Sequence, residues 1–374
     1  MTTQTATPRL RHVPALDGVR AVACLLVIVF HTWSVAAPGG LIGVDLFFVL
    51  SGFLITTLLL DEHRLTGRIA LAPFYARRAL RLLPALVVLL IGCGLIAALE
   101  PDATFAAATL RAVPYTVGYV ANWAYAYGVD LGLVAHTWSL SVEEQFYLLW
   151  PLMLVGLLRW FGARSALAAC FWGVLLVFAV RALLLARGGT WLELYGGSGT
   201  RADALLAGCA LALAAHLGLF RRVPAAVVAL LGMAGLAVIV WVVHNPDPYS
   251  WLLHGGFTLV AISAALVIAA LAVKPFAPLV WVLSLRPLTS IGKVSYGVYL
   301  WHYPLVLLIY PVVASRGASS PVVIAVLAYT LASLSYGLVE SPFLRLKRRI
   351  GAGEPAAPLE LRPKAGAGAR VAEG

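Results

Sequence analysis

Charged residues are scarce in this chain of 374 residues: only 11% are charged, whereas 61% are hydrophobic. A soluble domain carries about 25% charged residues, so a water-facing surface of this size is excluded. Apolar runs of roughly 20 residues recur along the whole chain, and each can cross the hydrocarbon core of a bilayer. Because no water at that depth can satisfy backbone polar groups, the runs should be helices. The alternating pattern of barrel strands is missing. We therefore predict an all-α, polytopic membrane protein.

Signatures of several other classes are missing as well. The 8 His residues include no HxxxH pair, and the 4 Cys residues lie far apart inside apolar runs, so we expect no metal site. The first apolar run carries Arg20 and lacks a small-residue cleavage site, so it should remain as a span rather than be removed as a signal peptide.

The net charge of +11 does not indicate a nucleic-acid partner, because no basic stripe with interleaved aromatic residues is present. Most Lys and Arg residues lie at the N-terminus, in the loops that follow even-numbered apolar runs, and at the C-terminus. This bias predicts that both termini are cytoplasmic. We predict ten spans, at 14–36, 41–60, 79–99, 139–159, 166–186, 201–219, 224–243, 254–273, 293–313 and 321–342.

These spans imply a cytoplasmic N-terminus (1–13), a transmembrane domain (14–345) and a Gly/Ala/Pro-rich cytoplasmic tail (346–374) that we expect to be disordered. The longest external loop, about 100–138, is rich in Trp and Tyr. Such aromatic residues favour an interfacial belt or an amphipathic helix, with a lid over a cavity as the second interpretation.

Ionisable side chains inside a membrane are costly, so each one suggests function. Arg20 and His31 are close to three helical turns apart and therefore share one face, with a rise of roughly 16 Å between them. Arg20 at the cytoplasmic boundary can hold or neutralise phosphate, and His31, deeper in the membrane, can accept a proton from a hydroxyl group. The alternative is that Arg20 snorkels and His31 is a hydrogen-bonded core residue.

The segment HTWSLSVEEQFYLLWP carries His136, Glu143 and Glu144. Adjacent helical positions point about 100° apart, so we expect only one of the two Glu residues to face a cavity. That carboxylate can orient an imidazole or bind sugar hydroxyls. A helix-start carboxylate favoured by the helix dipole is the alternative.

Three arginines, Arg77, Arg78 and Arg81, begin the third span. Guanidinium groups grip phosphates with a fork geometry, so this cluster can bind the phosphates of coenzyme A, although topology anchoring also explains it. The remaining polar candidates are expected to bind substrate or to pair within the membrane, as Asp45 can with Arg201 or Arg181. These candidates are Asp45, His136, Arg201, Asp203, Tyr299 and His302.

Six blocks of sequence resemble the acyltransferase-3 family of membrane O-acyltransferases. In order, they are LDGVRAVACLLVIVFH, GVDLFFVLSGFLI, FYARRALRLLP, HTWSLSVEEQFYLLWP, GKVSYGVYLWHYPL and SYGLVESP, and together they cover about 14–342. The family's Arg-then-ten-then-His motif falls on Arg20 and His31. Its arginine cluster falls on Arg77, Arg78 and Arg81, and its Glu-containing block on Glu143 and Glu144.

The resemblance implies an enzyme of the bacterial inner membrane that transfers an acyl group, acetyl as the first choice, from acyl-CoA to a hydroxyl. The acceptor would be a carbohydrate or glycoside, either a cell-envelope glycan or a macrolide-type metabolite. His31 would act as the base for direct attack by the hydroxyl, with Glu143 and Glu144 in the catalytic set and a transient acyl-enzyme as the alternative mechanism. Acyl-CoA would be a co-substrate rather than a bound cofactor. The tail is too short for the hydrolase-like domain of many members, so the chain would act alone or pass its acyl group to another protein. A transporter or flippase that uses the buried charges as a relay is the competing hypothesis.

Overall fold

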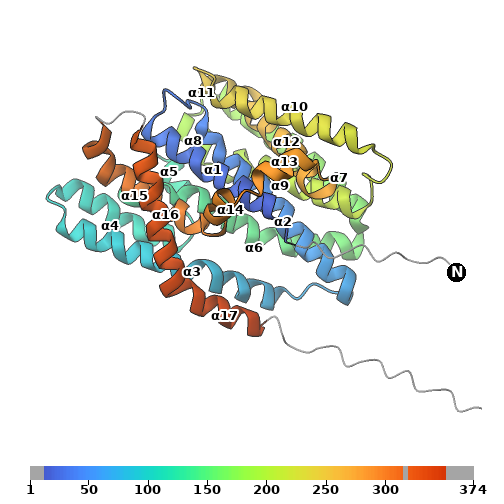
Figure 1. Cartoon of the computed structure of the whole chain (residues 1–374), viewed down its shortest axis with the longest axis horizontal. Helices are drawn as coiled ribbons and strands as arrows, with labels where there is room; N and C mark the ends of the chain where they lie inside the picture. The colour runs from blue at the N-terminus through green and yellow to red at the C-terminus, as the bar shows by residue number, and fades with distance from the viewer. Residues whose placement is uncertain (1–11, 315–318, 351–374) are drawn as a thin grey trace, which may run out of the picture.

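The computed structural model describes residues 12–314 and 319–350, and within them every regular element is helical (Figure 1). The all-α prediction is therefore confirmed. Residues 1–11 and 351–374, which make up most of the predicted N-terminal segment and tail, lie outside the described residues.

The longer helices are α1 (Pro14–Thr32), α2 (Gly43–Thr66), α3 (Leu71–Leu99), α4 (Ala103–Val117), α6 (Thr137–Trp160), α7 (Gly162–Ala186), α9 (Ser198–His216), α10 (Ala225–Val243), α12 (Phe257–Ile268), α15 (Ser295–Val313) and α16 (Ser320–Ser335). The shorter ones are η1 (Gly40–Ile42), α5 (Ala121–Ala126), η2 (Gly132–Val134), α8 (Trp191–Gly196), α11 (Pro248–Trp251), α13 (Ala277–Leu283), α14 (Arg286–Lys293) and α17 (Ser341–Ile350). Three π-helical segments, η3 (Leu252–Gly256), η4 (Ala269–Val273) and η6 (Tyr336–Glu340), extend α12 or join α16 to α17.

Among the described residues, 8 helices are long and apolar enough to cross a membrane. They are Pro14–Thr32, Gly40–Thr66, Leu71–Leu99, Gly162–Ala186, Ala225–Val243, Pro248–Val273, Ser295–Val313 and Ser320–Leu346. The predicted spans 139–159 and 201–219 correspond to α6 and α9, which are helical but more polar and do not belong to this set. The chain is thus a polytopic membrane protein, while the count of ten and the side of the termini stay predictions.

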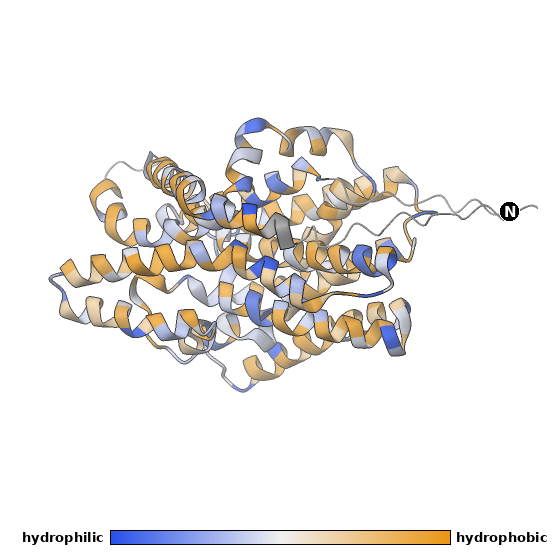
Figure 2. Cartoon of the chain, turned by 90° about the horizontal axis from the view of Figure 1, so that it is seen from below, coloured by the Kyte–Doolittle hydropathy of each residue, from blue (hydrophilic) through white to orange (hydrophobic). Residues whose placement is uncertain are grey.

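The two ends of the helical bundle differ in charge. One end of the bundle is defined by the start of α1, the loops that contain Arg68 and Arg222, and the first turn of α7 with Arg164. We call this end the basic side and the opposite end the far side. Hydrophobic residues cover most of the long helices, and hydrophilic residues gather at helix ends and at a few positions midway (Figure 2). This distribution suits helices that face lipid and enclose a small polar interior.

Glycines bring the backbones of α2 and α9 into contact. A Cβ atom at Gly52 would lie 2.0 Å from the carbonyl oxygen of Leu205, and one at Gly208 would lie 2.0 Å from that of Val49. Small residues permit such close helix packing in membranes. The close approach places the polar residues of α2 and α9 within reach of one another.

The aromatic loop between α3 and α6 folds back into the bundle. Asp102 caps α4, since its Oδ1 accepts hydrogen bonds from the backbone N–H groups of Thr104 (2.9 Å) and Phe105 (3.2 Å). α4 then runs beside α3 (Figure 1), and the turn after it places Tyr119 in the wall of a cavity. Tyr119 thus lines a cavity, whereas Tyr115, Trp123 and Tyr127 of the same loop are exposed, so the interfacial belt stays a prediction.

Candidate active site

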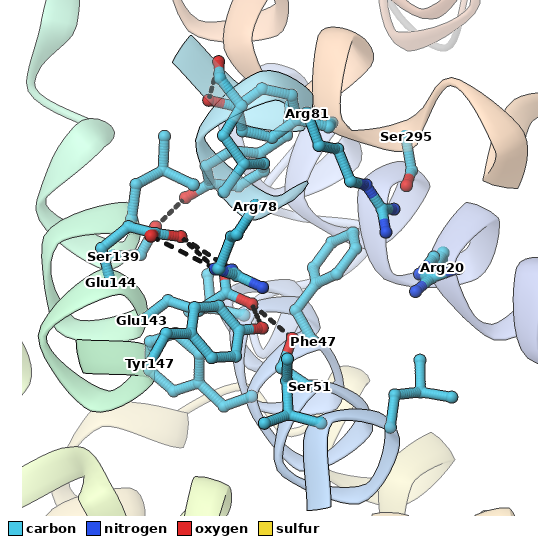
Figure 3. A pocket seen from close by; sticks show the side chains of 18 of the residues that line it. Arg20, Phe47, Ser51, Arg78, Arg81, Ser139, Glu143, Glu144, Tyr147 and Ser295 are labelled. Carbon is cyan, nitrogen blue, oxygen red and sulfur yellow. Dashed lines mark hydrogen bonds and ion pairs between the residues drawn. The ribbon is translucent and has the colours of Figure 1, made fainter. Parts of the chain in front are cut away.

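A cavity of about 130 Å³, which we call the basic-side cavity, lies among α1, α2, α3, α6 and the start of α15. Its polar lining comprises Arg20, Ser51, Arg78, Arg81, Tyr119, Ser139, Glu143, Glu144, Tyr147, Ser295, Tyr296 and Tyr299 (Figure 3). Both Glu143 and Glu144 face this space, so the expectation that only one would do so is wrong. The cavity wraps around the face of α6 widely enough to include two neighbouring positions.

The carboxylate of Glu143 is held by two hydroxyl groups. Ser51 of α2 donates a hydrogen bond to its Oε1, and Tyr147, one turn further along α6, donates another (Figure 3). The two hydroxyl groups therefore fix the position of the Glu143 carboxylate. Ser51 thus makes a polar contact in the cavity wall.

The guanidinium group of Arg78 is fixed on two sides. Its Nη2 donates to Glu144 Oε1 at 2.7 Å and its Nε lies 3.2 Å from the same oxygen. The guanidinium carbon lies 3.0 Å from the centre of the Tyr147 ring, which gives a cation–π contact. Arg78 therefore has a defined position in the cavity wall.

The other two cations of the cavity are less fully neutralised. Arg20 pairs with Asp17 at 3.1 Å, whereas Arg81 forms no ion pair with any residue of the described segments. Arg20 and Arg81 face each other across the cavity near Ser295 (Figure 3). Glu143 and Glu144 line the same cavity, so its charges are mixed, and Arg81 is the lining guanidinium that has no ion-pair partner among the described residues and can bind an anionic ligand.

Arg77 does not belong to this cluster. It points towards Glu62, with 4.0 Å between Arg77 Nη2 and Glu62 Oε2, and it does not line the basic-side cavity. Helical spacing alone does not separate the three arginines, because Arg81 shares a face with Arg78 at three residues and with Arg77 at four. The packing of α3 against its neighbours decides that Arg78 and Arg81 line the cavity and that Arg77 does not.

A second cavity of about 170 Å³ lies on the far side and is called the far-side cavity. Its lining is largely aromatic and includes Phe30, His31, Tyr125, His136, Trp138, Trp191, Tyr195, Tyr249, Tyr299 and Tyr303. Burial raises the pKa of Tyr125 to about 12, so its phenol stays protonated and can donate a hydrogen bond. Aromatic faces and hydroxyl groups of this kind suit a carbohydrate, which presents apolar C–H faces between hydroxyls.

Three histidines gather at the far-side cavity. The ring centre of His302 lies 5.7 Å from that of His31 and 5.3 Å from that of His136. Nδ1 of His302 is hydrogen-bonded to the carbonyl oxygen of Tyr299, so Nδ1 carries the proton and the buried Nε2 has a free lone pair. In the part of the chain that the structure describes, no three His, Cys, Asp or Glu residues are placed to hold a metal ion together.

His31 lies apart from the two glutamates. It lines the far-side cavity and contacts the rings of His302 and Tyr303, while Glu143 and Glu144 line the basic-side cavity and not the far-side cavity. The predicted catalytic set is thus divided: the structure gives His31 aromatic neighbours, and it pairs Glu144 with Arg78 and Glu143 with hydroxyl groups.

Two ion pairs lie buried behind the far-side cavity. Arg201 Nη2 donates to Asp45 Oδ1 at 2.8 Å, and Arg181 Nη2 donates to Asp203 Oδ2 at 2.8 Å. Arg201 is 0% exposed, and its guanidinium carbon lies 3.8 Å from the centre of the Phe257 ring. The pairing of Asp45 with Arg201 is as predicted. None of the four charged residues lines either cavity, so the structure does not support the substrate contacts expected of Asp45, Arg201 and Asp203.

The remaining predicted residues are divided between the cavities. Arg20, Arg78, Arg81, Glu143 and Glu144 line the basic-side cavity, His31 and His136 line the far-side cavity, Tyr299 lines both, and His302 packs behind His31. Sequence reasoning missed Ser139 and Tyr147, although both are four residues from Glu143 on α6 and so share its face. Tyr119 carried no such signal, because a turn places it in the cavity.

Comparison with known proteins identifies the class of protein that these features define. Residues 13–338 match the family described as the acyltransferase domain, so the chain belongs to this family of membrane acyltransferases.

Relatives include the O-acetyltransferase OatA of Staphylococcus aureus (strain NCTC 8325 / PS 47), which is 35% identical over 348 residues that make up 89% of this chain and 57% of the relative. The peptidoglycan O-acetyltransferase OatA of Listeria monocytogenes is 34% identical over 348 residues, 89% of this chain and 56% of the relative. The chain thus spans little more than half the length of these relatives. No solved structure matches the chain.

Proposed function

We propose that this protein transfers an acetyl group from acetyl-CoA, bound from the basic side, to a hydroxyl group of a cell-envelope glycan at the far side. The observation that carries the proposal is the division of one helix between two cavities. α1 presents Arg20 to the basic-side cavity and His31 to the far-side cavity. Arg20, which can bind an anion, and His31, which can accept a proton, thus lie on one face of α1 with a rise of roughly 16 Å between them.

The basic-side cavity suits the phosphate groups of the donor. Arg81 has no carboxylate partner among the described residues, and Arg20 shares only Asp17. Arg78, although paired with Glu144, keeps a fixed orientation against Tyr147. Guanidinium groups bind phosphate oxygens through parallel hydrogen bonds, so a coenzyme A phosphate is a chemically matched ligand.

The far-side cavity suits acyl transfer to a hydroxyl. His31 accepts the proton of the acceptor hydroxyl as its oxygen bonds to the carbonyl carbon of the thioester. The carbon–sulfur bond then breaks, the electron pair leaves with sulfur, and the proton passes from His31 to the thiolate. The products are the ester and free coenzyme A, and no oxidant or reductant is required.

The printed names of the relatives support the acyl group and the acceptor. The Listeria relative is named a peptidoglycan O-acetyltransferase, and we extend that acceptor class to this chain because the far-side cavity is lined by aromatic and hydroxyl-bearing side chains. A multi-pass position in a bacterial inner membrane is part of the same proposal.

Thermal unfolding of the detergent-solubilised protein tests the donor site. At a concentration 100 times its dissociation constant, acetyl-CoA should stabilise the folded protein by about 2.7 kcal/mol. Arg81→Gln should abolish most of the shift. Arg77→Gln is the matched control, because Arg77 lies four residues away on the same helix, faces Glu62, and should leave the shift intact.

Transfer of radiolabelled acetyl to isolated peptidoglycan then tests the chemistry. His31→Ala should keep the thermal shift and lose the labelled glycan. If Arg77→Gln and Arg81→Gln reduced the thermal shift equally, the result would contradict donor binding in the basic-side cavity. The absence of any shift in a folded wild-type protein would exclude the donor and favour transport.

A further inference from the structure

The two cavities are separated by a thin wall that contains Tyr299. Among the described residues, only Tyr299 and Val44 line both the basic-side and the far-side cavity. Both side chains are well packed, with exposures of 7% for Tyr299 and 5% for Val44. The wall is therefore closed in this structure.

Hydrogen bonds hold the Tyr299 ring across the junction. Its Oη lies 2.5 Å from Ser139 Oγ and shares a hydrogen bond with it, and it also donates to the carbonyl oxygen of His136 at 3.3 Å. Ser139 and His136 belong to the start of α6, while Tyr299 belongs to α15. The phenol thus bridges two helices with a contact that a side-chain rotation can release.

The remaining contacts of Tyr299 are with flat rings. Its ring centre lies 6.0 Å from that of Phe47 on the basic side, and 5.6 Å and 5.0 Å from those of His136 and His302 on the far side. Tyr299 therefore touches residues of both compartments, and a movement of its ring would join the two spaces directly beside the histidine cluster.

We propose that Tyr299 is a gate that the acyl end of the donor must pass, and that the width of this gate selects short acyl groups. This inference rests on the proposed function, because a donor with its phosphates beside Arg20 must extend past Tyr299 to bring its thioester to His31. The hydrogen bond to Ser139 acts as the latch. Closed, the gate keeps water of the basic side from the thioester; open, its width is limited by the neighbouring Val44 and Phe47.

Alternative roles make different predictions for the same residue. A Tyr299 that only packed α15 against α6 would affect all donors equally when replaced. If Tyr299 supplied a proton to the reaction, loss of its hydroxyl group would inactivate the enzyme without changing its selectivity among acyl groups. A gate changes the ratio of long to short donors and the coupling of thioester cleavage to ester formation.

The test compares acetyl-CoA with hexanoyl-CoA as donors for the purified protein with peptidoglycan as acceptor, and measures both ester formed and thiol released. In Tyr299→Ala, the ratio of hexanoyl to acetyl transfer should rise at least about tenfold, the scale on which apolar pockets discriminate added methylene groups. Tyr310→Ala is the matched control, because Tyr310 is on the same helix and lines neither cavity; its ratio should equal that of the wild type.

Two smaller changes test the latch separately. Tyr299→Phe and Ser139→Ala each remove the hydrogen bond and keep the ring, so thiol release should exceed ester formation severalfold relative to Tyr310→Ala. These variants decide the matter if Tyr299→Ala does not fold.

A ratio of hexanoyl to acetyl transfer equal to that of the wild type in folded Tyr299→Ala would overturn the gate. Equal amounts of thiol released and ester formed in both Tyr299→Phe and Ser139→Ala would overturn it as well. Failure of the wild type to transfer either acyl group would instead overturn the proposed function, so the two failures are distinguishable.

Discussion

The hydroxyl group of Ser51 on α2 donates a hydrogen bond to the carboxylate of Glu143 on α6, across 92 positions of sequence. Tyr147 donates to the same carboxylate oxygen from one turn away. This arrangement fixes the wall of the basic-side cavity opposite the arginines. Glu143 therefore orders two helices as well as contributing negative charge to the site.

Replacement of Glu143 by Gln should destabilise the protein. Hydrogen bonds to a charged group contribute about 1.5–3 kcal/mol each, and the amide is a weaker acceptor for both hydroxyl groups. We expect a lower thermal midpoint and weaker acetyl-CoA binding. Glu100→Gln, at the far end of α3 and outside both cavities, is the control. Equal midpoints for the two variants would contradict a structural role for the carboxylate.

The buried pair of Asp45 and Arg201 should behave differently from an exposed pair. Removal of one partner leaves an uncompensated buried charge, which costs about 3–5 kcal/mol. Asp45→Asn and Arg201→Gln should each be severely destabilised, and the double variant should recover part of the loss. Denaturation of the four proteins in a double-mutant cycle measures this coupling.

The control for that cycle is the half-buried Asp61→Asn, whose carboxylate lies 3.6 Å from Arg64 at the basic end of α2. A surface pair contributes about 0–1 kcal/mol. If Asp45→Asn were no more destabilising than Asp61→Asn, the buried pair would not have the structural role assigned here.

Two glycine substitutions should have opposite effects. Gly52→Ala places a Cβ atom 2.0 Å from the carbonyl oxygen of Leu205, so α2 and α9 must separate, at a typical cost of about 1–3 kcal/mol. Gly94→Ala, inside α3, has no neighbouring atom within 4 Å and should stabilise that helix by up to about 1 kcal/mol. Thermal midpoints of both variants check the prediction, and a neutral Gly52→Ala would refute the tight contact.

The turn that carries Tyr119 is held by an amide clamp. Gln145 Nε2 donates to the carbonyl oxygen of Tyr119 at 2.8 Å and to Asn122 Oδ1 at 2.9 Å, while Gln145 Oε1 accepts from Ser198 Oγ at 2.6 Å. Tyr119 has a φ of 52°, in the left-handed region that disfavours side chains, so the clamp maintains a strained backbone.

Gln145→Glu keeps the shape of the side chain and removes both donated hydrogen bonds. We expect faster amide hydrogen exchange over residues 118–124, because the left-handed turn loses its restraint. Asn245→Asp is the matched amide-to-acid control, since the Asn245 side chain serves only as an acceptor, for the backbone N–H of Asp247. Unchanged exchange in Gln145→Glu would show that the clamp is dispensable.

The fold class followed directly from composition, because a chain with so few charges can be stable only in lipid. The helical periodicity also placed Arg20 and His31 on one stripe of α1, and the structure presents them to the two cavities. These conclusions depend on local geometry, in which the spacing of residues sets the face that they share.

The choice among neighbouring residues depended on packing. The sequence offered Arg77, Arg78 and Arg81 as equivalent cations, and the rotation of α3 against α6 brought only Arg78 and Arg81 into the cavity. It offered Glu143 and Glu144 as alternatives, and the cavity is wide enough to include both. No periodicity within one helix contains that information.

What the sequence by itself determined is the class of fold, an all-α membrane protein, and which polar residues of one helix share a face, because hydrophobicity and helical rise are properties of a single segment. What only the tertiary structure decided is the partner of each polar group. Asp45 and Arg201 are separated by 156 positions, and Ser139 and Tyr299 by 160. Their contacts depend on how helices pack through glycine and aromatic side chains. This packing buries the ion pair of Asp45 and Arg201, and it places Ser139 and Tyr299 in the wall between the two cavities.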